Sequence, residues 1–221
     1  MNCLPTNSVK NNDSCYGGLY FSRVNSHNAK EAIIVQNDIF PDWDATLHIL
    51  AACDMSILSR NLPDFVLNIG KVDYYLAKLC DEIIGMTGIY TYTQTTLLNE
   101  CWLGWYGVRP PFRKAGYGKT ILDWTISQAI SEGFDILRLY SSESYFPNAI
   151  KLYGKLGFEC ESYKAEGGIY DKLLIFSMQL SDKPIELLNN RFMNFAAETE
   201  LCNPSNEVKE EILLKYKDIR R

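Results

Sequence analysis

The segment from Val108 to Thr120 constrains this chain more than any other part of its sequence. A strand-like run ends at Val108, and the most clearly amphipathic stretch of the chain begins at Gly116, where we expect a helix that ends near Ser131. The loop between them combines two glycines with three cations, namely Arg113, Lys114, Gly116, Gly118 and Lys119. The sequence therefore predicts a strand-to-helix junction with a basic, glycine-containing loop.

Such a junction has the properties of an anion site. The first backbone N–H groups of a helix have no intrahelical partner, and the helix dipole adds partial positive charge there. Glycines at 116 and 118 would let a phosphate approach those N–H groups. We therefore expect a phosphate or pyrophosphate to bind here. A solvated helix start is the alternative for this segment taken alone.

A P-loop is a second alternative. Gly118-Lys119-Thr120 resembles the end of the G-x-x-x-x-G-K-[ST] motif. That motif requires glycine at position 113, where this chain has Arg113. The bulky side chain disfavours a nucleotide-binding P-loop.

Two linked motifs resemble the GNAT superfamily of N-acetyltransferases. The run from Val108 to Gly118 resembles the signature V-x-P-x-x-[QR]-x-x-G-x-[GA]. About 30 residues downstream, the run from Asn148 to Phe158 resembles the second signature, A-x-x-L-Y-x-K-x-G-F. Their order and separation also fit, and the resemblance covers roughly residues 72–180.

The resemblance implies an α/β (α+β) fold. We expect a mixed, mostly antiparallel, twisted sheet of about seven strands flanked by about four helices, in which two central parallel strands splay apart. These would be the strands that end at Val108 and near Tyr140. Residues 16–180 would form the acetyltransferase domain. Outside the resemblance, the polar, Asn-rich residues 1–15 predict a flexible arm, and residues 181–221 predict a C-terminal extension with an amphipathic helix.

Local patterns predict the individual elements. We expect strands at 18–24, 72–77, 83–92, 100–108, 135–140, from 158 and at 173–180, and helices at 28–36, 45–59, 116–131, 147–156 and 207–219.

The resemblance also implies that acetyl-coenzyme A is the co-substrate. Its pantetheine arm would pair with the strand backbone at 106–108, and its pyrophosphate would rest on residues 114–119. Relatives carry an asparagine seven residues before the motif tyrosine, where this chain has Phe146, so Asn148 is the candidate replacement. The expected cofactor-binding residues are Tyr106, Gly107, Val108, Arg113, Lys114, Ala115, Gly116, Tyr117, Gly118, Lys119, Thr120 and Asn148.

Three side chains are candidates for proton transfer. Tyr153 matches the tyrosine that protonates the coenzyme A sulfur in related enzymes, and a phenol, with a reference pKa of about 10, holds its proton at neutral pH. Glu100 would share a strand face with Val108 if no bulge intervened, and Glu143 follows the strand near Tyr140. Either glutamate could be the general base, a water could relay the proton, or no base is needed. A backbone N–H, at Val108, would hold the oxyanion.

The expected function is transfer of an acetyl group from acetyl-coenzyme A to a primary amine of a small molecule or peptide, directly within a ternary complex. The C-terminal extension could pack on the domain or exchange between two subunits in a homodimer. The alternative is a non-catalytic module on the same fold that binds acyl-coenzyme A or a partner protein.

Charge, hydropathy and cysteine content argue against several other classes of protein. The net charge of −5 argues against a nucleic-acid partner. No stretch approaches the roughly 20 apolar residues that span a bilayer, so we expect no membrane partner. Seven cysteines without a C-x-x-C pair, and two distant histidines, predict no metal site. Reduced cysteines and a cytoplasmic location are the expectation.

Overall fold

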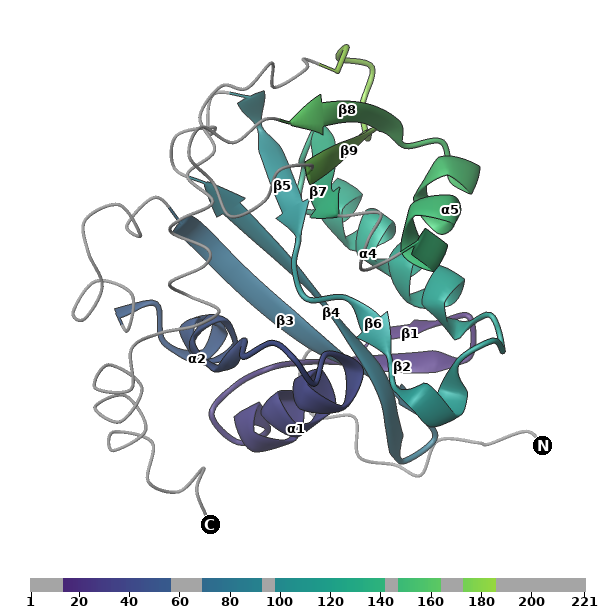
Figure 1. The fold of residues 1–221 in the computed structure, drawn as a ribbon. Coiled ribbons are helices and arrows are strands. Elements are labelled where there is room, and N and C mark those ends of the chain that lie inside the picture. The colour runs from purple at the N-terminus through teal and green to yellow at the C-terminus, as the bar shows by residue number, and fades with distance from the viewer. Residues whose placement is uncertain (1–13, 57–68, 93–97, 142–146, 164–172, 186–221) are drawn as a thin grey trace.

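The computed structural model describes residues 14–56, 69–92, 98–141, 147–163 and 173–185. These residues form one nine-stranded sheet with helices on both faces (Figure 1). The strands are β1 (Ser14–Tyr16), β2 (Leu19–Arg23), β3 (Ile69–Leu79), β4 (Glu82–Tyr92), β5 (Glu100–Leu103), β6 (Gly107–Val108), β7 (Ile136–Ser141), β8 (Glu159–Tyr163) and β9 (Leu173–Gln179). The helices are α1 (Ala29–Ile39), α2 (Thr46–Cys53), α4 (Tyr117–Ser131) and α5 (Pro147–Lys155), with a 3₁₀ turn, η3, at Pro110–Phe112.

The strand order is β1-β2-β3-β4-β5-β7-β9-β8, and β6 pairs with β4 beside this path. Every neighbouring pair is antiparallel except β5 and β7, which are parallel. The expected mixed, mostly antiparallel sheet with four flanking helices is thus confirmed. The described strands exceed the expected seven because β1 is added and because the run at 100–108 forms two strands. The predicted helix at 207–219 lies outside the described residues.

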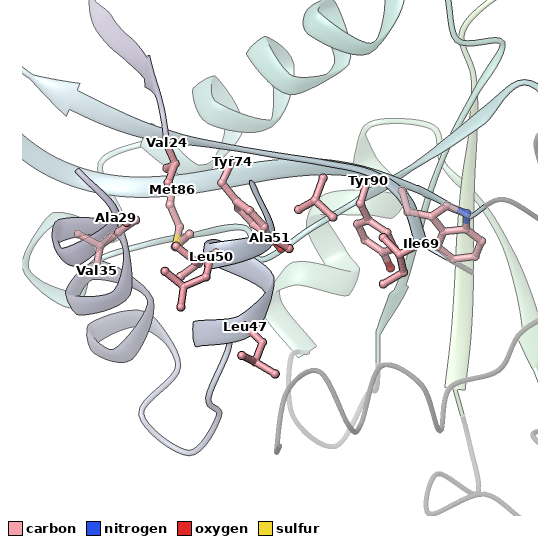
Figure 2. Close-up of a cluster of buried hydrophobic side chains, with 14 of the residues drawn as sticks. Val24, Ala29, Val35, Leu47, Leu50, Ala51, Ile69, Tyr74, Met86 and Tyr90 are labelled. Carbon is pink, nitrogen blue, oxygen red and sulfur yellow. The ribbon is translucent and has the colours of Figure 1, made fainter. Parts of the chain in front are cut away.

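The helices divide the core into two layers. Helices α1 and α2 cover one face of the sheet, and α4 and α5 cover the other (Figure 1). Figure 2 shows Tyr74, Met86 and Tyr90 pointing from the sheet toward the side of α1 and α2, where Leu50 and other buried side chains of the same cluster lie. This packing results from the alternation of side chains along β3 and β4.

Local sequence signals determine where the helices begin and end. Helix α4 begins after Gly116, whose φ of 87° suits a residue without a Cβ. Helix α5 begins with Pro147, which is favoured at a first helical position, and Gly157, with a φ of 85°, follows its end. These boundaries agree closely with the expected ones.

The two parallel strands separate after a short common stretch. Their register runs from Glu100 opposite Ile136 to Trp102 opposite Arg138 and stops there. Strand β7 continues along β9, whereas the chain after β5 turns toward β4 and pairs with it again as β6. The expectation that the central parallel strands splay therefore holds.

A bend at Gly104–Tyr106 causes this separation, and the prediction of one continuous strand at 100–108 is wrong. The Gly104 N–H donates to the Gly88 carbonyl at 2.8 Å, and β6 starts only at Gly107. A Cβ at position 104 would lie 2.7 Å from the Tyr74 hydroxyl oxygen, so glycine is needed for the chain to pass.

The cysteines only partly follow expectation. Cys15, Cys53 and Cys101 are free thiols, but Cys80 is disulfide-bonded, so the expectation of reduced cysteines is wrong for this residue. Among the described helices, none combines the length and the apolar character that crossing a bilayer requires.

Candidate functional site

The loop before α4 exposes unpaired backbone N–H groups. Lys114 and Gly116 both have positive φ, 68° and 87°, and these two left-handed positions wind the chain tightly into the helix. No side chain caps the helix start at Gly116. The N–H groups of Tyr117 and the next two residues consequently have no intrahelical acceptor. Backbone N–H groups in this arrangement could bind an anion, so the anion site stays a prediction.

The cations of the loop have different surroundings. The Arg113 guanidinium turns back and donates to the carbonyls of Val108, at 2.9 Å, and of Ile39, at 3.3 Å. It therefore ties the loop to β6 and to the end of α1. Lys119 pairs with Asp123 at 2.5 Å, one helical turn away. Lys114 is exposed and forms no ion pair within the described ranges.

Tyr106 joins the two halves of the candidate cofactor site. Its backbone immediately precedes β6, and its hydroxyl donates to the carbonyl oxygen of Gly118 at 2.6 Å. A Cβ at Gly118 would lie 3.2 Å from that hydroxyl, so the glycine makes the approach possible. The pKa of Tyr106 is raised mainly by burial, and to a smaller extent by the nearby Tyr153. Sequence reasoning assigned only the Tyr106 backbone to the site and missed its side chain, because a contact across 12 residues leaves no periodic signal.

Strand β6 fits closely between its neighbours. A Cβ at Gly85 would lie 2.5 Å from the Gly107 carbonyl oxygen, and one at Gly107 would lie 2.5 Å from Cγ2 of Ile39. Gly85 pairs with Val108, and Met86 pairs with Gly107. Glycines on both strands thus allow β6 to lie close to β4 and to Ile39 of α1.

Tyr153 lies on α5 with its side chain almost fully enclosed. Its ring centroid lies 5.3 Å from that of Phe176 and 5.7 Å from that of Phe158. Burial raises the pKa of its phenol above the ordinary value of 10. The group therefore holds its proton at neutral pH, as a proton donor must.

Glu100 is part of a buried ion pair. Its carboxylate accepts from Nε of Arg138 at 2.5 Å and from the Trp102 indole at 3.2 Å, and both side chains of the ion pair are completely buried. Ser177 accepts from the same guanidinium at 2.7 Å. The condition for the Glu100 hypothesis also fails, because the bend at 104–106 interrupts the strand before Val108. We therefore do not retain Glu100 as a general base.

Two further residues of the prediction have different outcomes. Glu143 lies outside the described residues, as does Phe146. Asn148 is exposed on the first turn of α5.

In the part of the chain that the structure describes, no three His, Cys, Asp or Glu side chains gather as a metal site would require.

Comparison with known proteins gives a consistent result. The family model described as "Acetyltransferase (GNAT) family" matches residues 43–158. No curated protein matches the chain.

Solved structures share the fold at low sequence identity. A GNAT-family protein from Desulfovibrio desulfuricans is 17% identical with a TM-score of 0.55, over 74% of this chain and 99% of that one. A GNAT-family acetyltransferase from Staphylococcus aureus is 18% identical with a TM-score of 0.52, over 74% and 99%. The ribosomal-protein-S18-alanine N-acetyltransferase from Escherichia coli is 16% identical with a TM-score of 0.51, over 76% and 98%.

Proposed function

The chain belongs to the acetyltransferase (GNAT) family, and we propose from this premise that it transfers an acetyl group from acetyl-coenzyme A to a primary amine. The observation that carries the proposal is the contact between Tyr106 and Gly118. It joins the strand that would bind the pantetheine arm to the loop that would bind the pyrophosphate, so both parts of one elongated ligand have a continuous site.

The residues present fit such a ligand. A Cβ at Gly116 would meet no other atom within 4 Å, and the loop from Arg113 to Thr120 would present N–H groups and exposed Lys114 to a pyrophosphate. The separation of β5 from β7 leaves backbone groups at Tyr106–Val108 for the amides of the pantetheine arm. Asn148, at the start of α5, is a further candidate contact.

Acetyl transfer requires that the amine loses a proton, that the oxyanion is stabilised and that the departing sulfur gains a proton. The acceptor nitrogen attacks the thioester carbon, and the Val108 N–H would donate to the oxygen that becomes negative. As the carbon–sulfur bond breaks, Tyr153 would give its proton to the departing sulfur. The proton of the amine would pass to water, because Glu100 is held in its ion pair with Arg138.

The acceptor is the amine of a small molecule or a peptide. Peptide amines fit because the S18-alanine N-acetyltransferase shares the fold.

We take residues 16–180 as the catalytic domain and residues 181–221 as an extension that could exchange between the two subunits of a homodimer. In the cytoplasm, the proposed location, the protein would have access to its co-substrate acetyl-coenzyme A.

Titration calorimetry with acetyl-coenzyme A tests binding, and release of free thiol across a panel of small amines and amino-terminal peptides tests transfer. We expect micromolar binding and acceptor-dependent thiol release. Absence of binding at millimolar concentration would overturn the proposal.

A non-catalytic acyl-coenzyme A-binding module is the second candidate. The burial of Glu100 against Arg138 favours it, since this carboxylate is unavailable as a base. Tight binding without transfer to any amine in the panel would support this candidate over the enzyme.

A further inference from the structure

A buried phenol reaches the bend at Gly104–Tyr106 from two strands away. Tyr74 lies on β3, and its side chain points toward the α2 side of the sheet (Figure 2). A Cβ at Gly88, its partner on β4, would lie 2.4 Å from the Tyr74 ring, and one at Gly104 would lie 2.7 Å from its hydroxyl oxygen. Two glycines on successive strands therefore open the path along which the ring crosses β4.

The hydroxyl at the end of this path binds the backbone of the bend. The N–H of Trp105 donates to the Tyr74 hydroxyl oxygen at 3.2 Å. This N–H belongs to the segment between β5 and β6, where the regular strand pairing is interrupted. The side chain thus replaces a strand partner at the point where β5 has left β7.

His48 on α2 holds the phenol from the other side. Its Nδ1 lies 3.0 Å from the Tyr74 hydroxyl oxygen, and both side chains are buried. Burial lowers the pKa of His48 to about 4, so its ring is neutral at pH 7 and can accept a hydrogen bond. Because the phenol oxygen already accepts from Trp105, its own hydrogen is available to Nδ1.

We propose that Tyr74, held by His48, is a positioning residue that fixes the bend at Gly104–Tyr106 and thereby places the N–H groups of β6 for the reaction. The inference rests on the proposed function. Trp105 is separated from Gly107 by one residue, so a shift of the bend is passed directly to β6. A displacement of roughly 1 Å at reacting groups can lower a rate about 100-fold.

A purely structural tyrosine would need only its ring, whereas this proposal needs the hydroxyl. The test is therefore Tyr74→Phe, which keeps the ring between Gly88 and Gly104. Tyr75→Phe is the matched control, because Tyr75 is the next residue of β3 and packs on the opposite face, with its ring 4.8 Å from that of Trp124.

In Tyr74→Phe we expect kcat to fall at least about 10-fold. The affinity for 3′-phospho-ADP, the nucleotide half of coenzyme A, should stay within about 2-fold, because the loop before α4 does not touch Tyr74. Tyr75→Phe should leave both quantities unchanged. A second variant, Gly104→Ala, pushes on the same hydroxyl from the bend and should also lower kcat.

Amide hydrogen exchange with labelled tryptophan gives a readout that needs no activity. The chain has four tryptophans, and the amide of Trp105 should exchange at least about 10-fold faster in Tyr74→Phe, while those of Trp102 and Trp124 should not change. Unchanged Trp105 exchange, or unchanged kcat, in Tyr74→Phe would overturn this inference alone. Failure of the unaltered protein to release thiol would instead overturn the proposed function.

Discussion

The Tyr106 hydroxyl donates a 2.6 Å hydrogen bond to the carbonyl oxygen of Gly118, and so connects the end of a bent strand to the first turn of α4. A net intramolecular hydrogen bond contributes about 1 kcal/mol. If this contact aligns the two halves of one ligand site, its loss should weaken ligand binding more than it weakens the fold.

Tyr106→Phe should therefore raise the Kd for coenzyme A about 5-fold, as measured by calorimetry, in line with the loss of about 1 kcal/mol. The Kd for 3′-phospho-ADP should change less, because in the proposed binding mode the nucleotide half would contact the loop before α4 and not the strand. Equal weakening of both ligands would contradict a role in alignment.

Replacement of Tyr153 with Phe should lower kcat by about 100-fold or more, the usual scale for a general acid. The Kd for acetyl-coenzyme A should stay nearly constant, since the ring and its packing on Phe176 are kept. Because burial raises the pKa of Tyr153, the unaltered enzyme should also retain its kcat up to pH 10. A kcat that is unchanged by the substitution would show that another group protonates the sulfur.

The buried pair of Glu100 and Arg138 should matter for stability. Glu100→Gln removes the nearest carboxylate of the guanidinium, which keeps Glu161 at 3.9 Å, so we expect a loss near the lower end of the usual range, about 3 kcal/mol in the free energy of unfolding, measured with urea. The double variant Glu100→Gln/Arg138→Met should lose less than the sum of the single variants. Asp38→Asn, which breaks the more exposed pair with Arg109, should cost about 1 kcal/mol or less.

The variant Glu100→Gln also distinguishes a structural role of Glu100 from a catalytic one. At a temperature where Glu100→Gln is folded, its kcat should be close to that of the unaltered protein. A large fall in kcat without a loss of stability would restore Glu100 as the general base.

Stability should fall in mild acid because of His48. Its pKa is about 4 in the folded protein and near 6.5 in the unfolded chain, so the unfolded state takes up the proton first. The free energy of unfolding should drop by about 1.4 kcal/mol per pH unit between pH 6.5 and pH 4, with no further loss from this group below pH 4.

His48→Asn keeps an acceptor for Tyr74 but does not titrate, so urea unfolding between pH 4 and pH 7 should show a shallower slope in this variant. His27→Asn, at the exposed second histidine, should keep the slope of the unaltered protein. Identical slopes in both variants would contradict the assignment to His48.

Local chemistry was sufficient to predict several element boundaries of the fold. Gly116 and Pro147 lie where helices start, and Gly157 lies where one ends, because backbone preferences act within a few residues. The tight turn into α4 lies where the motif places it, whereas the roles of the loop and of Tyr153 stay predictions.

The features that sequence reasoning missed depend on distant partners. The bend after β5 forms where Tyr74, about 30 residues earlier, crosses Gly88 and reaches Gly104. Glu100 is neutralised by Arg138, 38 residues later. Neither relationship has a fixed spacing, so neither could be found from periodicity along one chain.

The short parallel register between β5 and β7 also bears on self-association. Where the two strands part, the sheet has a backbone edge in its middle and not only at β1 and β8. Exposed edges invite pairing with other chains and aggregation. This inner edge, however, lies between strands of the same sheet and not at its outer margin, so another sheet cannot be added to it as at β1 or β8. If the proposed ligand binds there, its backbone hydrogen bonds would come from an edge that does not invite the growth of a fibril.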